Sequence, residues 1–174
     1  RIEAERALRR INTILDALNN WQRRLADSSD HVDLLDEMCQ IIIEQGQYHS
    51  VWIGLVEQNN SQQVKPEAYL CFEEEDLAGL NITYGDEPPE ALHYPAGRAV
   101  RTGQIVVIHN TNVDDAYRSW QDVAAKYGYQ SMIALPLRAN DKTLGVLSVY
   151  AASPDAFNDQ EKTLLQKLAD ALAY

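Results

Sequence analysis

Two adjacent apolar runs near the C-terminal end, within residues 131–150, predict a pair of strands that are buried on both faces. Every residue from Met132 to Leu137 is apolar, so the first strand has no polar face. Asn140 and Asp141 lie between the runs, and both residue types tolerate the left-handed backbone angles of a tight turn. A hairpin of this kind belongs inside a sheet, and other parts of the chain must cover both of its faces.

Shorter apolar runs predict the remaining strands of the same sheet. They lie at residues 50–56, 64–72, 80–84 and 105–109, which together with the hairpin makes about six strands. A proline has no N–H to donate to a neighbouring strand. We therefore expect Pro136, in the middle of the hairpin, to face a bulge, an edge or a ligand cavity.

Apolar residues three and four positions apart predict the helices. Two long helices precede the first strand, at residues 1–26 and 31–45, and a third begins after Asn158, a typical N-cap residue. Two short helices are predicted at residues 91–102 and 120–127, each followed by a glycine. This order predicts an α+β fold with a central antiparallel sheet of about six strands. The N- and C-terminal helices cover one face, and short helices with loops cover the other.

The first helix carries a stripe of leucine and isoleucine with the spacing of a coiled-coil seam, widened on one flank by Ala7, Ile14 and Trp21. Such a helix either packs on its own domain or forms a dimer and connects to an upstream module, and the length of the stripe favours the dimer. Residues 1–28 are then a connector helix and residues 29–174 the globular domain. The predicted dimer interface consists of Leu8, Ile11, Leu15, Leu18, Leu165, Leu168 and Leu172.

Composition and charge narrow the classes of partner. The chain has 174 residues, 45% of them hydrophobic and 24% charged, as expected of a globular domain. Its formal net charge of -11 disfavours nucleic acid and anionic membrane surfaces as partners. No apolar run approaches the roughly 20 residues of a membrane span. Cys39 and Cys71 are interpreted as reduced, buried thiols of a cytoplasmic protein. The chain begins at Arg1 without a methionine, so we interpret it as a fragment of a longer protein.

The sequence contains no pattern typical of an enzyme. It has no glycine-rich phosphate loop, no HExxH and no nucleophile elbow. The acidic residues 73–76 lack the spacing of a calcium loop and are interpreted as a solvated run of charge. His93 and His109 flank the probable roof of short helices and loops, which leaves a haem or iron site as an alternative, although dispersed histidines are more often structural.

Several segments in order resemble the GAF domain, a small-molecule sensor module of phosphodiesterases, cyclases, phytochromes and bacterial signalling proteins. They are GRAVRTGQ at residues 97–104, GYQSMIALPL at residues 128–137, LGVL at residues 144–147, and Phe157 with Asp159 and Glu161. The resemblance runs from about residue 34 to residue 172. It implies a six-stranded antiparallel sheet, terminal helices that often form a dimer bundle, and a ligand pocket roofed by the two short helices. It is strongest to bacterial domains placed ahead of histidine kinase, GGDEF or EAL output domains, which implies a role in cyclic-di-GMP or related signalling.

Residues in and around the expected roof are the candidates for ligand binding. The aromatic side chains, Tyr127 among them, would stack on a ligand or simply pack in the core, and the arginines would bind a carboxylate or phosphate. Arg98 has an alternative partner in the acidic loop formed by Asp86, Glu87 and Glu90. The predicted ligand-binding residues are Tyr84, Tyr94, Arg98, His109, Arg118, Trp120, Tyr129 and Ser131.

The resemblance also allows specific GAF activities to be tested. A covalent bilin requires a cysteine in the roof segment, and residues 117–129 contain none; Cys71 lacks the aspartate that would precede a second attachment site. Methionine sulfoxide reductases of this fold require a set of redox cysteines that Cys39 and Cys71 do not provide. The sequence therefore favours a non-catalytic sensor without a cofactor, acting through a homodimer on a fused output domain. The alternatives are a ligand-free dimerisation spacer, which a filled sheet face would favour, and a haem or iron sensor.

Overall fold

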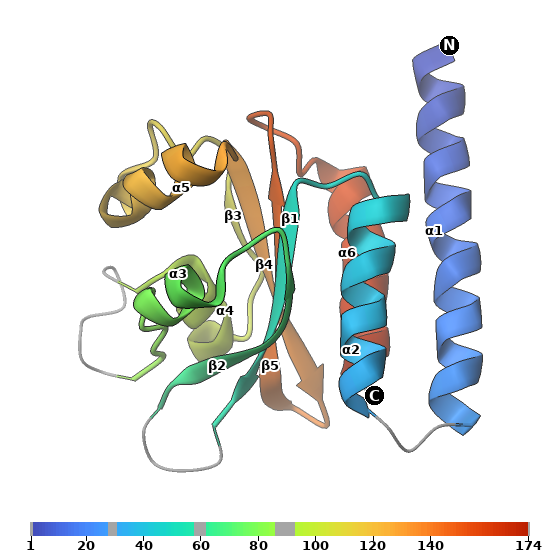
Figure 1. Ribbon diagram of the computed structural model, residues 1–174, viewed down its shortest axis with the longest axis horizontal. Coiled ribbons are helices and arrows are strands. Elements are labelled where there is room, and N and C mark those ends of the chain that lie inside the picture. The colour runs from blue at the N-terminus through green and yellow to red at the C-terminus, as the bar shows by residue number, and fades with distance from the viewer. Residues whose placement is uncertain (1, 28–30, 58–61, 86–92, 174) are drawn as a thin grey trace.

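The computed structural model describes residues 2–27, 31–57, 62–85 and 93–173, and in it the chain adopts an α+β fold. Its centre is one antiparallel sheet with the strand order β2-β1-β5-β4-β3 (Figure 1). The strands are β1 (Ser50–Val56), β2 (Val64–Leu70), β3 (Val106–Ile108), β4 (Ser131–Ala139) and β5 (Lys142–Ala151). The predicted fold class is confirmed.

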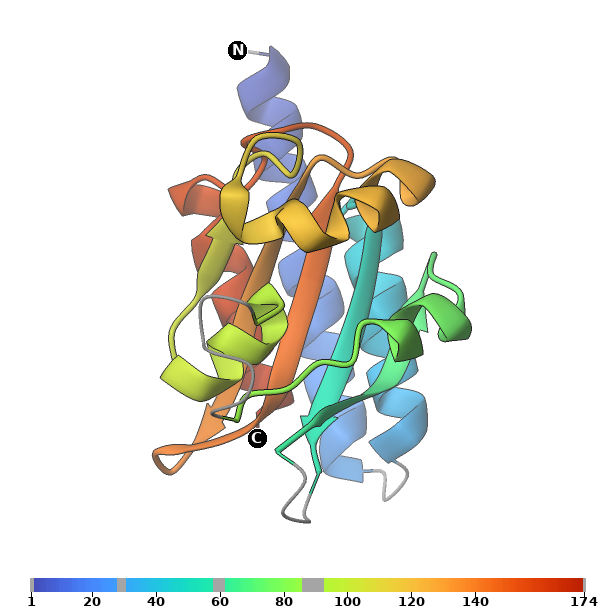
Figure 2. The ribbon, with the colours of Figure 1, turned by 90° about the vertical axis from the view of Figure 1, so that its left-hand side faces the viewer.

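Helices cover the sheet on both sides, as the apolar strands require (Figures 1 and 2). One face carries α1 (Ile2–Asp27), α2 (His31–Gln40), the π-helical turn η1 (Ile41–Gln45) and α6 (Asp159–Leu172). The other face carries α3 (Glu74–Gly79), α4 (Pro95–Thr102), the 3-10 helix η3 (Asp115–Trp120) and α5 (Gln121–Tyr127). We call α4, η3 and α5 the roof.

The predicted hairpin forms the middle of the sheet. Strands β4 and β5 pair along their whole length, and Asn140 and Asp141 adopt positive φ angles of 53° and 62° in the turn. Pro136 lies beyond the end of β3, which pairs only with residues 132–134 of β4. One edge of β4 therefore has no paired strand at this position, which agrees with the expected placement of a proline.

Three details differ from the sequence-based expectations. The segment at residues 80–84 is not a strand of the sheet, because only a single bridge joins Thr83 to Gln63. Residues 73–75 of the acidic run are exposed, as expected, but the run also opens helix α3, which was not predicted, and its Asp76 binds α5. Cys71 is exposed rather than buried, whereas Cys39 is buried, and neither forms a disulfide.

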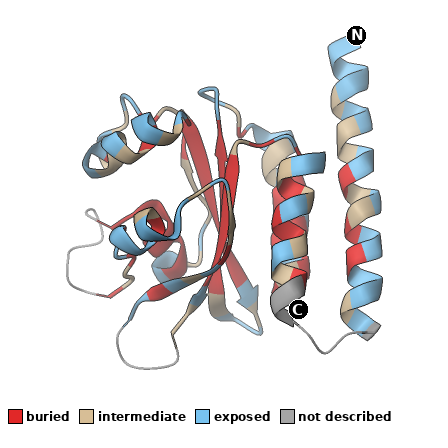
Figure 3. Ribbon diagram, viewed as in Figure 1, coloured by how far each residue is buried: buried red, intermediate tan, exposed pale blue. Residues whose placement is uncertain are grey.

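Helix α1 packs on its own domain through residues of its apolar stripe and of the flank beside it. Ile14, Leu18 and Trp21 are buried in the same core cluster as α2, α6 and the sheet (Figure 3). The Trp21 indole N–H also donates a hydrogen bond of 2.7 Å to the Leu34 carbonyl of α2. The helix that was predicted as a connector packs on the globular domain, and the division of the chain at residue 28 remains a prediction.

This packing corrects part of the predicted dimer interface. Leu18, Leu165 and Leu168 are at most 7% exposed, because they fill the core between the sheet and the terminal helices of one chain. They have no surface to offer a second copy in this arrangement. Leu8 is 57% exposed, and the other three predicted positions, Ile11, Leu15 and Leu172, are partly buried against the core.

Candidate functional site

Aromatic side chains from both layers meet between the sheet and the roof. Trp52 of β1 and Tyr150 of β5 point up from the sheet, and Tyr94, Tyr117 and Tyr129 come from the roof segments. All are buried, with at most 3% of each residue exposed. We call these five residues the tyrosine cluster.

Local backbone geometry brings the roof tyrosines into place. Gly128 ends α5 with a φ of 83°, a left-handed conformation that lets the chain turn back towards the sheet at Tyr129. Pro95 begins α4 directly after Tyr94. On α4, a Cβ atom at Gly97 would lie 2.1 Å from the Thr83 carbonyl oxygen, so glycine permits the close approach of these segments.

The polar ends of the cluster converge on one another. The Trp52 indole N–H donates to the Tyr150 hydroxyl at 2.7 Å. The Tyr150 hydroxyl lies 2.7 Å from that of Tyr94, which in turn lies 2.9 Å from that of Tyr117. Tyr117 is hydrogen-bonded to Tyr129, which completes a chain of four hydroxyl groups. The layer between sheet and roof therefore has a polar centre surrounded by apolar groups.

Burial keeps these hydroxyl groups neutral. It raises the pKa of Tyr129 to about 12, and it raises the pKa values of Tyr94, Tyr117 and Tyr150 well above the usual value, where negative charge on neighbouring tyrosines would add to the effect. The cluster is thus an uncharged set of hydrogen-bond donors and acceptors at neutral pH.

Ser148 adds a further hydroxyl group on the sheet side. It is fully buried and pairs across the sheet with Trp52 on one side and Ala134 on the other. It is near enough to Tyr150 to help lower that pKa, but its Oγ has no hydrogen bond of normal geometry to a described residue. Two small side chains, Ala134 and Ser148, therefore lie side by side at the centre of this face.

A polar clasp closes the cluster at its β2 side. Asp76 of α3 accepts hydrogen bonds from Lys126, at 2.7 Å, and from Tyr127, both on α5. The bond from Lys126, followed by that from Tyr127, lowers the pKa of Asp76. Phe72 packs edge-on against Tyr127 and Tyr150 with ring centroids 4.9 Å apart in each pair. The clasp joins α3 to the roof outside the cluster.

The structure brings together only some of the predicted ligand-binding residues. Tyr94 and Tyr129 belong to the tyrosine cluster, and Trp120 packs edge-on against Tyr94 at 5.0 Å. Tyr84 is half-buried against the same apolar layer. These four positions agree with an aromatic site, and their role in binding remains a prediction.

The predicted charged and polar residues lie elsewhere. The Arg118 side chain is 76% exposed and pairs with Asp115 at 2.7 Å, so it does not reach the cluster. His109 is also exposed, 3.7 Å from Asp155. Ser131 donates to the Ser153 carbonyl at 2.7 Å. Arg98 is half-buried on α4, and its suggested acidic partners lie outside the described residues. The anion-binding role expected of the two arginines therefore has no support in this geometry.

Trp52, Tyr117, Tyr150 and Ser148 are members of the site that the sequence-based prediction missed. Strands β1 and β5 are apolar on both faces, so their pattern does not distinguish the face that meets the roof from the face that meets the helices. The alternation of Ser148 and Tyr150 was the available signal, because residues two apart on a strand share a face.

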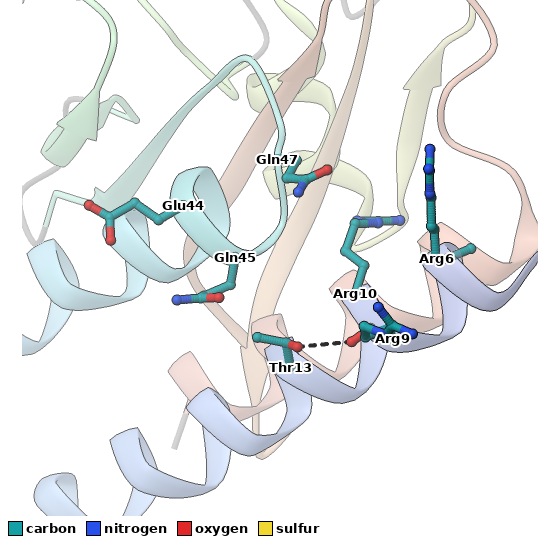
Figure 4. A pocket seen from close by; sticks show the side chains of 8 residues that line it. Arg6, Arg9, Arg10, Thr13, Glu44, Gln45 and Gln47 are labelled. Atoms are coloured by element: carbon teal, nitrogen blue, oxygen red, sulfur yellow. Dashed lines mark hydrogen bonds between the residues drawn. The ribbon is translucent and has the colours of Figure 1, made fainter. Parts of the chain in front are cut away.

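Five hollows among the described residues lie away from the cluster. One of about 520 Å³ lies between α1 and η1, on the other side of the sheet, with Arg6, Arg9 and Arg10 on its α1 side (Figure 4). Arg10 is already bound to the Gly46 carbonyl at 2.8 Å and to Glu161. In the described part of the chain, no three His, Cys, Asp or Glu side chains gather closely enough to hold a metal ion. None of the described helices combines the length and apolar character that a membrane span needs.

The family model of the GAF domain matches residues 28–174, and the chain therefore belongs to the GAF domain family. Members of this family are usually regulatory sensors. No curated protein sequence matches the chain.

Solved structures support the same fold at low sequence identity. Free methionine-R-sulfoxide reductase from Neisseria meningitidis, in complex with its substrate, is 19% identical, with a TM-score of 0.72 over 94% of this chain and 87% of that one. The GAF domain of an Acinetobacter phosphoenolpyruvate-protein phosphotransferase is also 19% identical, with a TM-score of 0.70 over 92% and 90%. That of a Coxiella burnetii phosphoenolpyruvate-protein phosphotransferase is 13% identical, with a TM-score of 0.73 over 94% and 92%. GAF domains of two phosphotransferases and a methionine sulfoxide reductase thus share this fold.

Proposed function

We propose that this GAF domain is a non-catalytic, cytoplasmic regulatory module that binds a small molecule between the sheet and the roof, at the tyrosine cluster. The observation that carries the proposal is the convergence of four tyrosine hydroxyl groups and an indole N–H inside an otherwise apolar layer. Burying so many polar groups costs free energy that aliphatic side chains of similar size would not cost. A binding role gives the sequence a reason to keep them.

Ligand binding at this place would act on the roof, because Tyr117 lies in η3 and Tyr94 and Tyr129 adjoin the ends of α4 and α5. A ligand that replaces one of their mutual hydrogen bonds favours a different roof position, and this shifts the equilibrium only by the difference in affinity between the two arrangements.

The terminal helices offer a route from the site to an output domain. Tyr150 of the cluster is one residue from the end of β5, and α6 follows that strand. Arg10 of α1 binds Glu161 in the first turn of α6, so the two terminal helices are joined there. We propose that a change at the roof reaches a fused output domain through these helices in a homodimer. The exposed Leu8 and the partly buried Ile11 and Leu15 of α1 would form the contact between copies.

A reductase function has less support. The chain has two cysteines, and they lie in different environments. Cys39 lies on the buried face of α2, where burial raises the pKa of its thiol to about 12, and Cys71 is exposed after β2. A thiol held protonated is a poor nucleophile.

A ligand-free spacer is the second candidate, and the closed packing of the tyrosine cluster favours it. Native mass spectrometry of freshly purified protein distinguishes the two functions. A bound small molecule that is lost from a Tyr94→Phe/Tyr117→Phe variant supports binding at the cluster. A protein without bound ligand that also gains no thermal stability from any compound in a metabolite panel supports the spacer.

A further inference from the structure

The hydrogen bonds of the tyrosine cluster define what kind of ligand it can accept. Four tyrosine hydroxyl groups and one indole N–H supply five protons, whereas four hydrogen bonds join these groups to one another. One phenolic proton is therefore left over. The buried hydroxyl of Ser148 lies near Tyr150 but forms no hydrogen bond of normal geometry to a described residue, so its proton is available to an acceptor.

Surplus donors in a buried site are satisfied by a group that accepts hydrogen bonds. Leaving a buried donor without a partner costs more free energy than a typical hydrogen bond contributes to stability. A ligand that brings an acceptor therefore removes this cost and also forms a new hydrogen bond. Aliphatic molecules of the same size would leave both protons unpaired. The cluster thus selects for an acceptor such as a carbonyl or an N-oxide oxygen.

A charged ligand is disfavoured for a separate reason. None of the five residues of the cluster carries a formal charge at neutral pH, and burial keeps the tyrosines neutral. The charged groups at its β2 side, Asp76 and Lys126, are bound to each other at 2.7 Å. A ligand with a net charge on its buried part would lose its hydration without meeting an opposite charge.

We infer that the site is selective for a small, uncharged molecule that carries a hydrogen-bond acceptor. The aromatic walls supply the apolar contact, with Trp120 and Phe72 packed around the tyrosine rings. This inference rests on the proposed function, and it replaces the anionic ligand that the arginines of the sequence suggested.

Four compounds of nearly the same shape test the inference on the whole chain by isothermal titration calorimetry at pH 7. They are benzamide, which is neutral with a carbonyl acceptor; benzoate, an anion; benzylamine, a cation; and toluene, which has no acceptor. We expect benzamide to bind at least about tenfold more tightly than the other three. Benzoate, benzylamine or toluene binding as tightly as benzamide overturns the inference.

A matched pair of variants locates the binding. Ser148→Ala removes the surplus hydroxyl, and Ser131→Ala removes a buried serine hydroxyl that is bound to the Ser153 carbonyl. Ser148→Ala should lower the preference for benzamide over toluene severalfold, and Ser131→Ala should leave it unchanged; equal effects overturn the inference.

The failure of the inference and the failure of the proposed function give different results. A charged molecule found on the purified protein and lost from the Tyr94→Phe/Tyr117→Phe variant overturns the inference and preserves the proposed function. If none of the four compounds binds, the inference is overturned. If native mass spectrometry and the metabolite panel also find no ligand, the proposed function falls with it.

Discussion

The two faces of the sheet are equally buried but chemically different. Towards the terminal helices, the strands present aliphatic residues such as Ile53, Leu135 and Val149, which pack on leucines and isoleucines of α1, α2 and α6. Towards the roof, the same strands present Trp52 and Tyr150, whose polar atoms are hydrogen-bonded to hydroxyl groups of the roof.

Because of this difference, we expect the helix-covered face to determine the stability of the fold and the roof face to determine ligand binding. Aliphatic packing is non-directional, so the helix-covered face gains free energy from contact and from loss of exposed apolar surface. A hydroxyl network is directional and costly to bury, so it contributes little net stability for the area that it occupies. We therefore expect substitutions on the first face to affect folding and those on the second to affect ligand binding.

The largest loss of stability should come from the helix-covered face. Leu165→Ala removes a fully buried side chain of α6 and should lower the free energy of unfolding by about 2–5 kcal/mol. Urea denaturation at pH 7 measures this change. A loss below that of the tyrosine variant described next would contradict the division between the faces.

A smaller effect is expected in the tyrosine cluster. Tyr117→Phe keeps the ring but removes a hydroxyl that contacts those of Tyr94 and Tyr129, which should cost about 1–3 kcal/mol because buried partners lose a hydrogen bond. Tyr48→Phe is the control on the opposite face, since Glu161 keeps Arg10 as a partner there. Only Tyr117→Phe should weaken ligand binding; an equal effect of both variants would remove the functional distinction.

Stability in alkaline solution should report the cluster as well. Burial raises the pKa of Tyr129 to about 12, above the value near 10 of an unfolded chain, so the folded state holds a proton that the unfolded state loses. The stabilising contribution is complete below pH 10 and is lost as the pH rises towards 12.

Tyr129→Phe isolates this effect. The decline in the free energy of unfolding between pH 9.5 and 11 should become shallower by up to roughly 1.4 kcal/mol per pH unit, as measured by urea denaturation. The same slope in variant and wild type would show that Tyr129 ionises normally in the folded protein.

The smallest effect is expected at the clasp. The hydrogen bonds from Lys126 and Tyr127 lower the pKa of Asp76, so its contribution is present above the usual value for aspartate and is lost as the pH falls through its folded value. Asp76→Asn should therefore narrow the gap in stability between pH 7 and pH 3. Asp115→Asn, in the exposed pair with Arg118, is the matched control and should leave that gap unchanged.

Much of the fold follows from local pattern. The double-sided hairpin, the Asn140–Asp141 turn and the N-cap at Asn158, whose side chain accepts from the Glu161 N–H at 2.9 Å, are properties of neighbouring residues and were predicted correctly. The helix that begins in the acidic run was not predicted. Its Asp76 is held by Lys126 of α5, and a contact between segments so far apart cannot be recognised from the acidic residues alone.

The candidate site was harder to predict from the sequence than the fold. Tyr94, Trp120 and Tyr129 were selected for lying in or near the roof, but Trp52 and Tyr150 were hidden in strands that are apolar on both faces. Arg118 was selected for its charge, and the structure places it in solvent beside Asp115. The dimer stripe of α1 likewise contains residues such as Leu18 whose partner is the chain's own core. The apolar pattern of a helix or strand predicts that a side chain will be buried, but it does not identify the residues that bury it.

Two tryptophans permit the most direct test of ligand binding at the roof face, because one indole N–H group lies on each face of the sheet. That of Trp52 donates to Tyr150 in the cluster, and that of Trp21 donates to the Leu34 carbonyl beneath α1. In ¹H–¹⁵N spectra of the protein with excess benzamide, we predict that the Trp52 indole resonance shifts and saturates while that of Trp21 keeps its position. A shift of Trp21 with an unchanged Trp52 would contradict the assignment of ligand binding to the roof face.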